Sequence, residues 1–277
     1  MAKVQVRGHH IWAHIVLSFW SLLVIFPLWI MVVNSFKSKL AIYRSPFGLP
    51  VPWTIDGYLS VFSRSSFPRY FLNSILVTTV SIVGIVILAS LAAYAIARWK
   101  SRLSTAVFLF FLAGMMIPIR IGSINLLMII RNLGLLDQLV GLLPIYIAMG
   151  MPIGVFVLTE FIRTVPPELT QAAYIDGAGN FRIFWQIVLP LTRPAMATVA
   201  IFNLVVLWND LWFPLIFIRS ESQRTLMLGV TRLFGQYQTD WTLILSTLTV
   251  ATIPIVLLYI LMAKQFIAGL TAGAVKG

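Results

Sequence analysis

The sequence predicts an all-α fold: a polytopic membrane helix bundle with six transmembrane helices, in a single membrane domain of residues 1–277. The first observation is composition, since 60% of the residues are hydrophobic, only 10% are charged, and the mean hydropathy is +0.95. A soluble domain carries roughly 25% charged residues, so a chain this apolar cannot cover a surface that faces water. The second observation is that apolar segments near the ~20 residues needed to cross a bilayer recur along the whole chain.

The six predicted spans differ in how clearly they are marked. The third is short and ends just before Arg120, the fifth contains Asp210, and the other four hold no charged side chain. Prolines inside spans, such as Pro27 and Pro254, are tolerated where neighbouring helices satisfy the freed backbone groups. No internal repeat is visible, which disfavours a carrier built from inverted repeats. The spans are 11–33, 71–97, 103–119, 139–159, 194–218 and 241–263.

An even number of spans places both termini on one side of the membrane. Lys and Arg are equally numerous on the two sides, but the turn from Arg98 to Arg102 is the densest basic segment. Basic loops favour the cytoplasm, so both termini are predicted to be cytoplasmic in a bacterial inner membrane. The proline-rich segment 35–70 then becomes an external loop with short structured stretches, and 121–127 becomes a helix at the outer interface.

Charge and residue usage exclude several other classes of protein. The formal net charge of +12 is spread singly between apolar runs, which suits contact with membrane lipid and not with nucleic acid. The chain has no cysteine, so disulfides, thiolate metal sites and cysteine nucleophiles are excluded. The three histidines all lie near the N-terminus, and no metal site is predicted.

The segment 166–190 between the fourth and fifth spans is predicted to form two short helices. Pro167 suits the first position of a helix, and Glu168 suits the positive end of its dipole. Gly177 can take the left-handed conformation that ends a helix. The residues predicted to share one face of this first helix are Leu169, Ala172, Ala173 and Asp176.

The second short helix is predicted to begin at Asn180, as its N-cap, and to be closed by Pro190. Two such helices are also typical of an ordinary amphipathic turn at a membrane surface, so this alternative stays open on physical grounds. The residues expected on one face of the second helix are Phe181, Phe184, Trp185 and Val188.

This segment resembles the EAA loop of binding-protein-dependent ABC importers. Ala172-Ala173 is followed after three residues by Gly177, and after nine more by Ile187-Val188-Leu189-Pro190. Gln171 stands where the family pattern has Glu. The carbohydrate branch, including the maltose-transporter permeases, is similar at further motifs: Pro166–Leu169, Ile175–Ala178, Trp208–Leu215, Met115–Pro118 and Leu133–Asp137.

The resemblance implies a type I ABC importer permease, which is the non-catalytic transmembrane subunit of an ATP-hydrolysing transporter. Its implied partners are a second homologous permease, two ATPase subunits (a homodimer or a heterodimer) and an external solute-binding protein. ATP and Mg would be bound by the ATPases, with no cofactor in this chain, which also lacks a phosphate-binding Gly-x-x-x-x-Gly-Lys-[Ser/Thr] loop. The residues implied to couple to the ATPase are Glu168, Gln171, Ala172, Ala173, Asp176 and Gly177.

Polar residues inside the spans are the candidates for the solute path. An acidic side chain within a span is costly and usually faces the bundle interior or a watery cavity, so Asp210 and its neighbour Asn209 stand out. Three roles stay open for Asp210: an anchor between helices, a lining residue of the solute path, and a proton relay. The further candidates are Trp208 and Trp212, whose rings suit sugars or a membrane interface, and Asn203 and Asn73.

The predicted function is therefore that of a permease forming the translocation path for a sugar-like solute, driven by ATP hydrolysis in partner subunits. One alternative is a secondary transporter or channel that works without ATPases, which would need its own coupling-ion site. Another is a structural membrane scaffold, which would not need the loop at 166–190.

Overall fold

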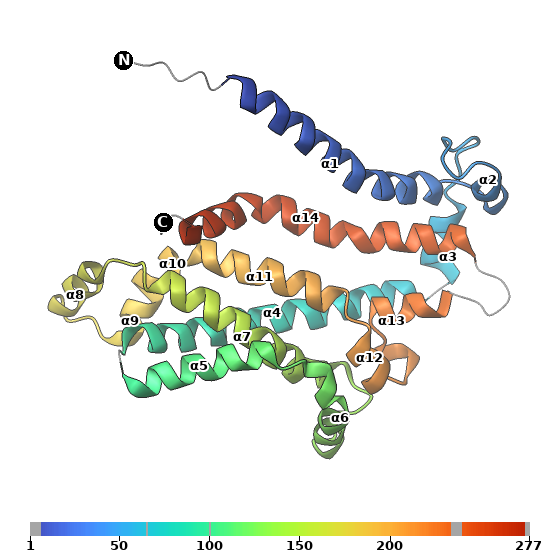
Figure 1. Cartoon of the computed structure of the whole chain (residues 1–277). Coiled ribbons are helices and arrows are strands. Elements are labelled where there is room, and N and C mark those ends of the chain that lie inside the picture. The colour runs from blue at the N-terminus through green and yellow to red at the C-terminus, as the bar shows by residue number, and fades with distance from the viewer. Residues whose placement is uncertain (1–6, 65, 100, 234–239, 275–277) are drawn as a thin grey trace. The chain divides into compact units, whose positions relative to one another are not determined.

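The computed structural model describes residues 7–64, 66–99, 101–233 and 240–274 (Figure 1). All regular secondary structure in these ranges is helical, so the all-α prediction is confirmed. The chain divides into two compact units, which are described separately. The first comprises Met1–Phe67 with Val230–Ile253, and the second Pro68–Gly229 with Pro254–Gly277.

The first unit contains the long helix α1 (Arg7–Ser35), two short helices α2 (Lys39–Arg44) and α3 (Asp56–Arg64), and the beginning of α14 (Trp241–Ala274). The short helices agree with the prediction of a partly ordered segment at 35–70. Buried Lys37 ties this segment to the end of α1, since its Nζ donates hydrogen bonds to Asn34 Oδ1 at 2.9 Å and to the Ser45 carbonyl at 2.7 Å.

The second unit is a bundle in which α5 and α11 both pack on α7. Its core includes Ile85 and Ala89 from α4, and Leu158 from α7. Gly154 on α7 lets α4 approach closely, because a Cβ there would lie 2.8 Å from the Ala89 Cβ. The helices are α4 (Phe67–Arg98), α5 (Arg102–Met116), α6 (Ser123–Asn132), α7 (Leu142–Ile162), α8 (Pro167–Ile175), α9 (Asn180–Ile183), α10 (Leu189–Leu191), α11 (Arg193–Trp208), α12 (Trp212–Phe217), α13 (Leu226–Val230) and the part of α14 from Pro254 onward.

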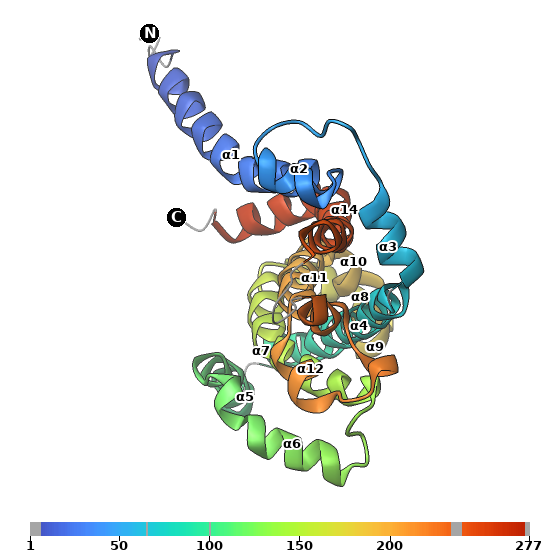
Figure 2. The same cartoon turned by 90° about the vertical axis from the view of Figure 1, so that its right-hand side faces the viewer.

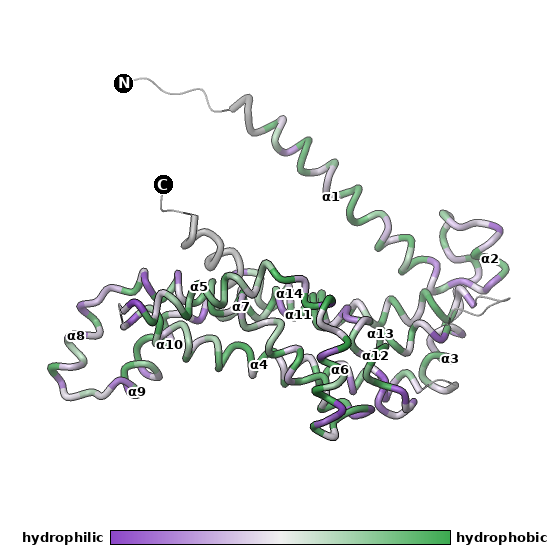
Figure 3. Tube along the Cα trace, turned by 60° about the horizontal axis from the view of Figure 1, so that its bottom comes forward, coloured by the Kyte–Doolittle hydropathy of each residue, from purple (hydrophilic) through white to green (hydrophobic). Residues whose placement is uncertain are grey.

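The two ends of this bundle carry different structures. Helices α8 and α9 lie at one end, and α6 lies at the other, turned out of the bundle direction (Figures 1 and 3). Viewed along the bundle, α5 and α6 lie at its periphery (Figure 2). The apolar stretches follow the long helices, whereas α8 and α9 alternate polar and apolar residues (Figure 3).

Four helical segments among the described residues are long and apolar enough to cross a membrane, or up to six if two bent pairs each count as one span. The four are Ile11–Ser35, Phe67–Arg98, Leu139–Ile162 and Trp241–Lys264, which match the first, second, fourth and sixth predicted spans. None of the most apolar window of Ile11–Ser35 is buried within the chain, so lipid or another subunit must cover it.

The third predicted span, 103–119, is not a straight helix. Arg102–Met116 and Ile119–Asn132 form a pair bent by 85°. The cause is Pro118, which forces Ile117 into an extended conformation (φ −89°, ψ 118°) and offers no backbone N–H to continue the helix. The helix predicted at 121–127 is present as α6.

The fifth predicted span, 194–218, is wrong as a continuous helix. Helix α11 ends at Trp208, and α12 begins only at Trp212. The apolar pair that passes as a bent span is instead Asn180–Leu191 with Arg193–Trp208, at an angle of 72°. Asp210 explains the break, because its carboxylate accepts backbone N–H groups that a continuous helix would use internally.

Candidate functional site

The two ends of α8 are set by a proline at its start and by a glycine that follows its last turn. Pro167 stands in the first turn with Glu168, and Gly177 follows the C-cap with φ +77°, as predicted. The N–H of Ala178 donates to the Ala173 carbonyl at 2.9 Å, and the N–H of Gly177 to the Tyr174 carbonyl at 3.0 Å. This pair of bonds is a Schellman motif, in which a left-handed residue satisfies carbonyls that the helix end leaves free. The chain therefore turns sharply at Gly177.

The four residues predicted to share one face of α8 do not share one environment in the structure. Thr170 and Ala173 are buried, whereas Leu169, Ala172 and Asp176 are exposed. Ala173 thus packs in the core of this unit and does not share an outward face with Ala172. Glu168, Gln171 and Gly177 are also exposed, so of the residues implied to couple to the ATPase only Ala173 is buried.

The second short helix departs from prediction at both ends. Gly179, not Asn180, occupies the cap position, and the Asn180 amide oxygen instead accepts a hydrogen bond from the Tyr174 hydroxyl. Pro190 does not close the helix, because Phe184–Val188 is wound as a π-helical turn in which the Leu189 N–H donates to the Phe184 carbonyl. The wider turn changes the hydrogen-bonding register just before the proline, and helix continues to Leu191.

The aromatic side chains of this segment also divide between two faces. Phe184 and Val188 are buried, and the Phe184 ring lies 5.3 Å from that of Tyr94 on α4. Phe181 and Trp185 are exposed on the other face, with ring centroids 6.0 Å apart. The predicted single face therefore splits into an inner anchor and an outer aromatic pair.

Two contacts from the end of α4 hold this loop. The Tyr94 hydroxyl donates a 3.4 Å hydrogen bond to the Asn180 carbonyl, and the Arg98 guanidinium lies 5.5 Å from the centre of the Tyr174 ring. Movement of the α8–α9 segment would therefore act directly on a membrane-spanning helix.

Asp210 lies in the break between α11 and α12 and is buried. Its carboxylate accepts the hydroxyl of Tyr146 on α7 at 3.0 Å, and the backbone N–H groups of Trp212 and Phe213 at 3.2 Å each. All three donors belong to the chain itself. This geometry suits the anchor role, because the carboxylate fixes the start of α12 and ties it to α7.

The three asparagines predicted for the solute path lie in different surroundings. Asn209 is exposed and donates to the Val205 carbonyl at 2.8 Å, while Asn203 is buried and donates to the Val199 carbonyl at 2.9 Å. Asn73 donates both amide hydrogens to the carbonyls of Ser222 and Arg224 and so holds a loop.

The two tryptophans also separate. Trp208 is buried, with its ring 5.8 Å from that of Phe71, whereas Trp212 is 40% exposed. The Trp212 indole N–H donates to the Ser123 hydroxyl at 2.9 Å, and Arg120 lies over its ring. The structure therefore brings Asp210 and Trp212 together but gives Trp208 a packing role.

Sequence reasoning missed two residues that organise this end of the bundle. Tyr146 pairs with Asp210; a tyrosine in an otherwise apolar span, whose hydroxyl must find a partner, was the available signal. Asp137 has φ 62°, and its carboxylate accepts the N–H groups of Arg219 and Ser220 at 2.7 Å each. The Ser220 hydroxyl also donates to Asp137, and these hydrogen bonds lower the pKa of its carboxyl.

The sequence of this chain is similar to those of transport-system permeases. Residues 85–271 match the family model described as "Binding-protein-dependent transport system inner membrane component". A putative ABC transporter permease protein of Caldicellulosiruptor sp. is 36% identical over 96% of this chain and 97% of its own length. A probable starch degradation products transport system permease protein of Thermoanaerobacterium thermosulfurigenes is 35% identical over 100% of both chains.

Solved structures show the same fold. A chain of a bacterial ABC transporter that imports the acidic polysaccharide alginate superposes with a TM-score of 0.80 at 21% identity, covering 96% of this chain and 99% of its own. A chain from the bacterial alginate transporter in complex with an alginate pentasaccharide-bound periplasmic protein gives a TM-score of 0.68 at 17% identity, over 92% and 93% of the two chains.

Proposed function

Because the chain belongs to the family of binding-protein-dependent transport system inner membrane components, we propose that it forms half of the translocation path of an ABC importer for a sugar or sugar-like solute. The chain is a permease subunit and a multi-pass inner membrane protein. A carbohydrate solute is supported by the relative that is a probable permease for starch degradation products. We also propose that both termini lie in the cytoplasm, which the basic turn between α4 and α5 supports.

The α8–α9 segment is the part of the chain that would convert ATP hydrolysis into movement. Its outer surface carries exposed Gln171 and Ala172, and the Schellman turn at Gly177 fixes its direction. Its inner side is attached to α4 through Tyr94. A partner ATPase that pulled on the outer surface would therefore move a membrane-spanning helix. This attachment is the single observation that carries the proposed coupling role.

The proposed partners follow from the family. They are a second homologous permease, two ATPase subunits that bind ATP and Mg, and an external solute-binding protein. The solved alginate transporter bound to its periplasmic protein supports the last of these. The uncovered apolar surface of α1 has to be covered by lipid or by the second permease.

The test is reconstitution of the complex. The chain is co-expressed with the products of neighbouring genes, purified, and assayed for ATP hydrolysis with and without candidate oligosaccharides and the binding protein. Stimulation by one solute class supports the proposal and names the class. Solute uptake by the chain alone in vesicles without any ATPase would contradict it and favour a secondary transporter.

A further inference from the structure

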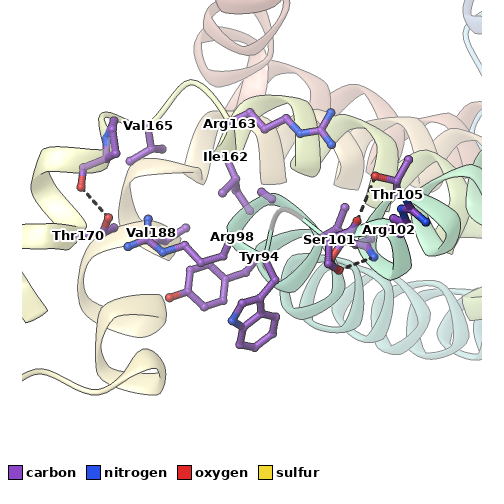
Figure 4. Close-up of a pocket in the computed structure, with 15 residues that line it drawn as sticks. Tyr94, Arg98, Ser101, Arg102, Thr105, Ile162, Arg163, Val165, Thr170 and Val188 are labelled. Atoms are coloured by element: carbon purple, nitrogen blue, oxygen red, sulfur yellow. Dashed lines mark hydrogen bonds between the residues drawn. The ribbon is translucent and has the colours of Figure 1, made fainter.

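A cavity of about 760 Å³ lies at the end of the second unit that carries α8 (Figure 4). The end of α4, the beginning of α5, the end of α7 and the beginning of α8 all contribute to its wall. It therefore lies where membrane-spanning helices meet the proposed coupling segment. Its volume is within the range of roughly 300–1,000 Å³ that is common for small-molecule sites.

The charge of the wall is entirely of one sign among the described residues. Arg98, Arg102 and Arg163 line the cavity, and none of its described lining residues is Asp or Glu. Arg163 is paired with Glu160 at 2.6 Å. Neither Arg98 nor Arg102 has a described carboxylate within ion-pair distance. The cavity therefore holds two guanidinium groups whose charge the described part of the chain leaves uncompensated.

The rest of the wall is divided between hydroxyl and apolar groups. Thr105, in the first turn of α5, stands beside Arg102 (Figure 4), while Ser104 from α5 and Thr170 from α8 also line the cavity. Ile162 from α7 and Val188 contribute apolar surface. Such a wall suits a ligand with an anionic head and an apolar body.

We propose that this cavity binds the phosphate-bearing headgroup of an anionic phospholipid. Arginine presents a planar fork that matches phosphate oxygens, and basic pockets between helices on the cytoplasmic side are suited to such headgroups. The adjacent Trp99 is largely exposed, as expected of a side chain at the membrane interface. The proposal rests on the cytoplasmic orientation given to this end under the proposed function.

An acidic segment of an ATPase is the competing occupant. The apolar surface contributed by membrane-spanning helices favours lipid, since a lipid has long acyl chains to bury there and an acidic segment has fewer apolar groups. A headgroup at Arg98 and Arg102 would contact the beginning of α8 through Thr170. A bound lipid would then stabilise the position of the α8–α9 segment, so the coupling of ATP hydrolysis to solute transport would depend on anionic lipid.

The experiment uses the purified transporter complex in nanodiscs of phosphatidylcholine mixed with phosphatidylglycerol. Native mass spectrometry measures the phosphatidylglycerol retained by the wild type, by Arg98→Gln/Arg102→Gln, and by Arg193→Gln. Arg193 is a matched control, being an exposed arginine at the beginning of α11 that does not line the cavity. The double variant should retain the lipid about tenfold more weakly, as expected for the loss of charge-assisted hydrogen bonds, while the control should not change.

Three results would overturn the proposal. Equal retention by the double variant and the control would show that the cavity does not select the lipid. Displacement of the lipid by soluble glycerol phosphate at low concentration would identify a free phosphoester as the ligand. Efficient cross-linking of Thr105→Cys to an ATPase would identify the protein occupant. Co-purification with the partner subunits establishes that each variant is folded, and solute-stimulated ATP hydrolysis of the wild type tests the proposed function independently.

Discussion

The hydroxyl of Tyr146 on α7 donates a 3.0 Å hydrogen bond to the carboxylate of Asp210, at the break between α11 and α12. Both side chains are buried, at 1% and 9% exposure. The bond joins two segments that are 64 residues apart in sequence, and with the N–H groups of Trp212 and Phe213 it gives both carboxylate oxygens donors from the same chain. A buried polar pair of this kind fixes one arrangement of the helices.

Replacing Tyr146 by Phe should therefore destabilise the assembled complex. The carboxylate would lose its side-chain donor in a buried site, at a cost of about 1–3 kcal/mol. The measurement is the thermal unfolding midpoint of the complex in nanodiscs, and Tyr146→Phe should lower it.

Asp210→Ala should reduce solute transport, and subunit co-purification distinguishes the reasons. Retained assembly with weak transport would indicate a role in the solute path, whereas lost assembly would indicate the anchor role. Asn209→Ala is the matched control for assembly, because Asn209 is exposed and, among the described residues, its side chain bonds only to the Val205 carbonyl. Normal transport and assembly by Asp210→Ala would contradict both roles.

The orientation of the chain in the membrane can be determined by labelling single introduced cysteines, since the native sequence has none. Ser60→Cys and Ser222→Cys should react with a membrane-impermeant thiol reagent added outside intact cells. Ser101→Cys, in the basic turn between α4 and α5, should react only after the membrane is opened. The reverse pattern would invert the proposed topology.

The sequence predicted the long helices well because an apolar run of sufficient length has few alternatives in a membrane. It also located the turn at Gly177, since only glycine enters the left-handed region without steric cost. The break at Asp210 was not predicted, because the apolar composition of 194–218 continues across it. What interrupts the helix is a pair of hydrogen bonds from Trp212 and Phe213, which composition does not reveal.

The inward face of α8 could not be predicted for a different reason. Its two faces are chemically similar, with Thr170 and Ala173 on the buried side and Ala172 on the exposed side. Periodicity selects a face only when the two faces differ in hydrophobicity. Contacts with the rest of the bundle decide which face of α8 is buried, and the residues that make these contacts lie far from α8 in the sequence.

The hydrogen bonds that the Asp137 carboxylate accepts from Arg219 and Ser220 should persist to acid pH. Hydrogen bonds from Ser220 and Arg219 lower the pKa of this carboxyl below its ordinary value of 3.8. A depressed pKa contributes stability that is present above the ordinary pKa and is lost as pH falls through the lowered value. Hydrogen exchange at the Arg219 and Ser220 amides should therefore stay slow down to below that ordinary pKa, and Asp137→Ala should accelerate it even at neutral pH. Equal hydrogen-exchange rates at these two amides in the wild type and in Asp137→Ala would show that the Asp137 carboxylate does not protect them.

Cross-linking can test which face of α8 meets the ATPase. Ala172→Cys should cross-link efficiently to a cysteine in the ATPase groove, because Ala172 is exposed, whereas Ala173→Cys should cross-link poorly, because Ala173 is buried in the chain's own core. Gln171→Glu, which restores the residue usual in the family, should leave transport unchanged, since Gln171 is exposed. Strong cross-linking at Ala173 alone would show that the opposite face docks.

Gly177→Val should abolish the stimulation of ATP hydrolysis by solute, and Gly179→Val is the matched control. A Cβ at either glycine would meet no heavy atom within 4 Å, so both positions have room for a Cβ. The two positions differ in backbone conformation, with φ +77° at Gly177 and −74° at Gly179. A β-branched residue is strongly disfavoured at positive φ, so valine at 177 should open the Schellman turn and redirect the chain after α8. Valine at 179 should be tolerated, and Gly177→Asn should be intermediate, because asparagine enters the left-handed region more readily than valine.

The readout is solute-stimulated ATP hydrolysis by the purified complex, with co-purification of all subunits as the measure of folding. Loss of stimulation in Gly177→Val with full assembly, against normal stimulation in Gly179→Val, would tie coupling to the direction of this turn. Normal stimulation in both would show that coupling does not depend on the direction of this turn, and the role proposed for Gly177 would have to be abandoned.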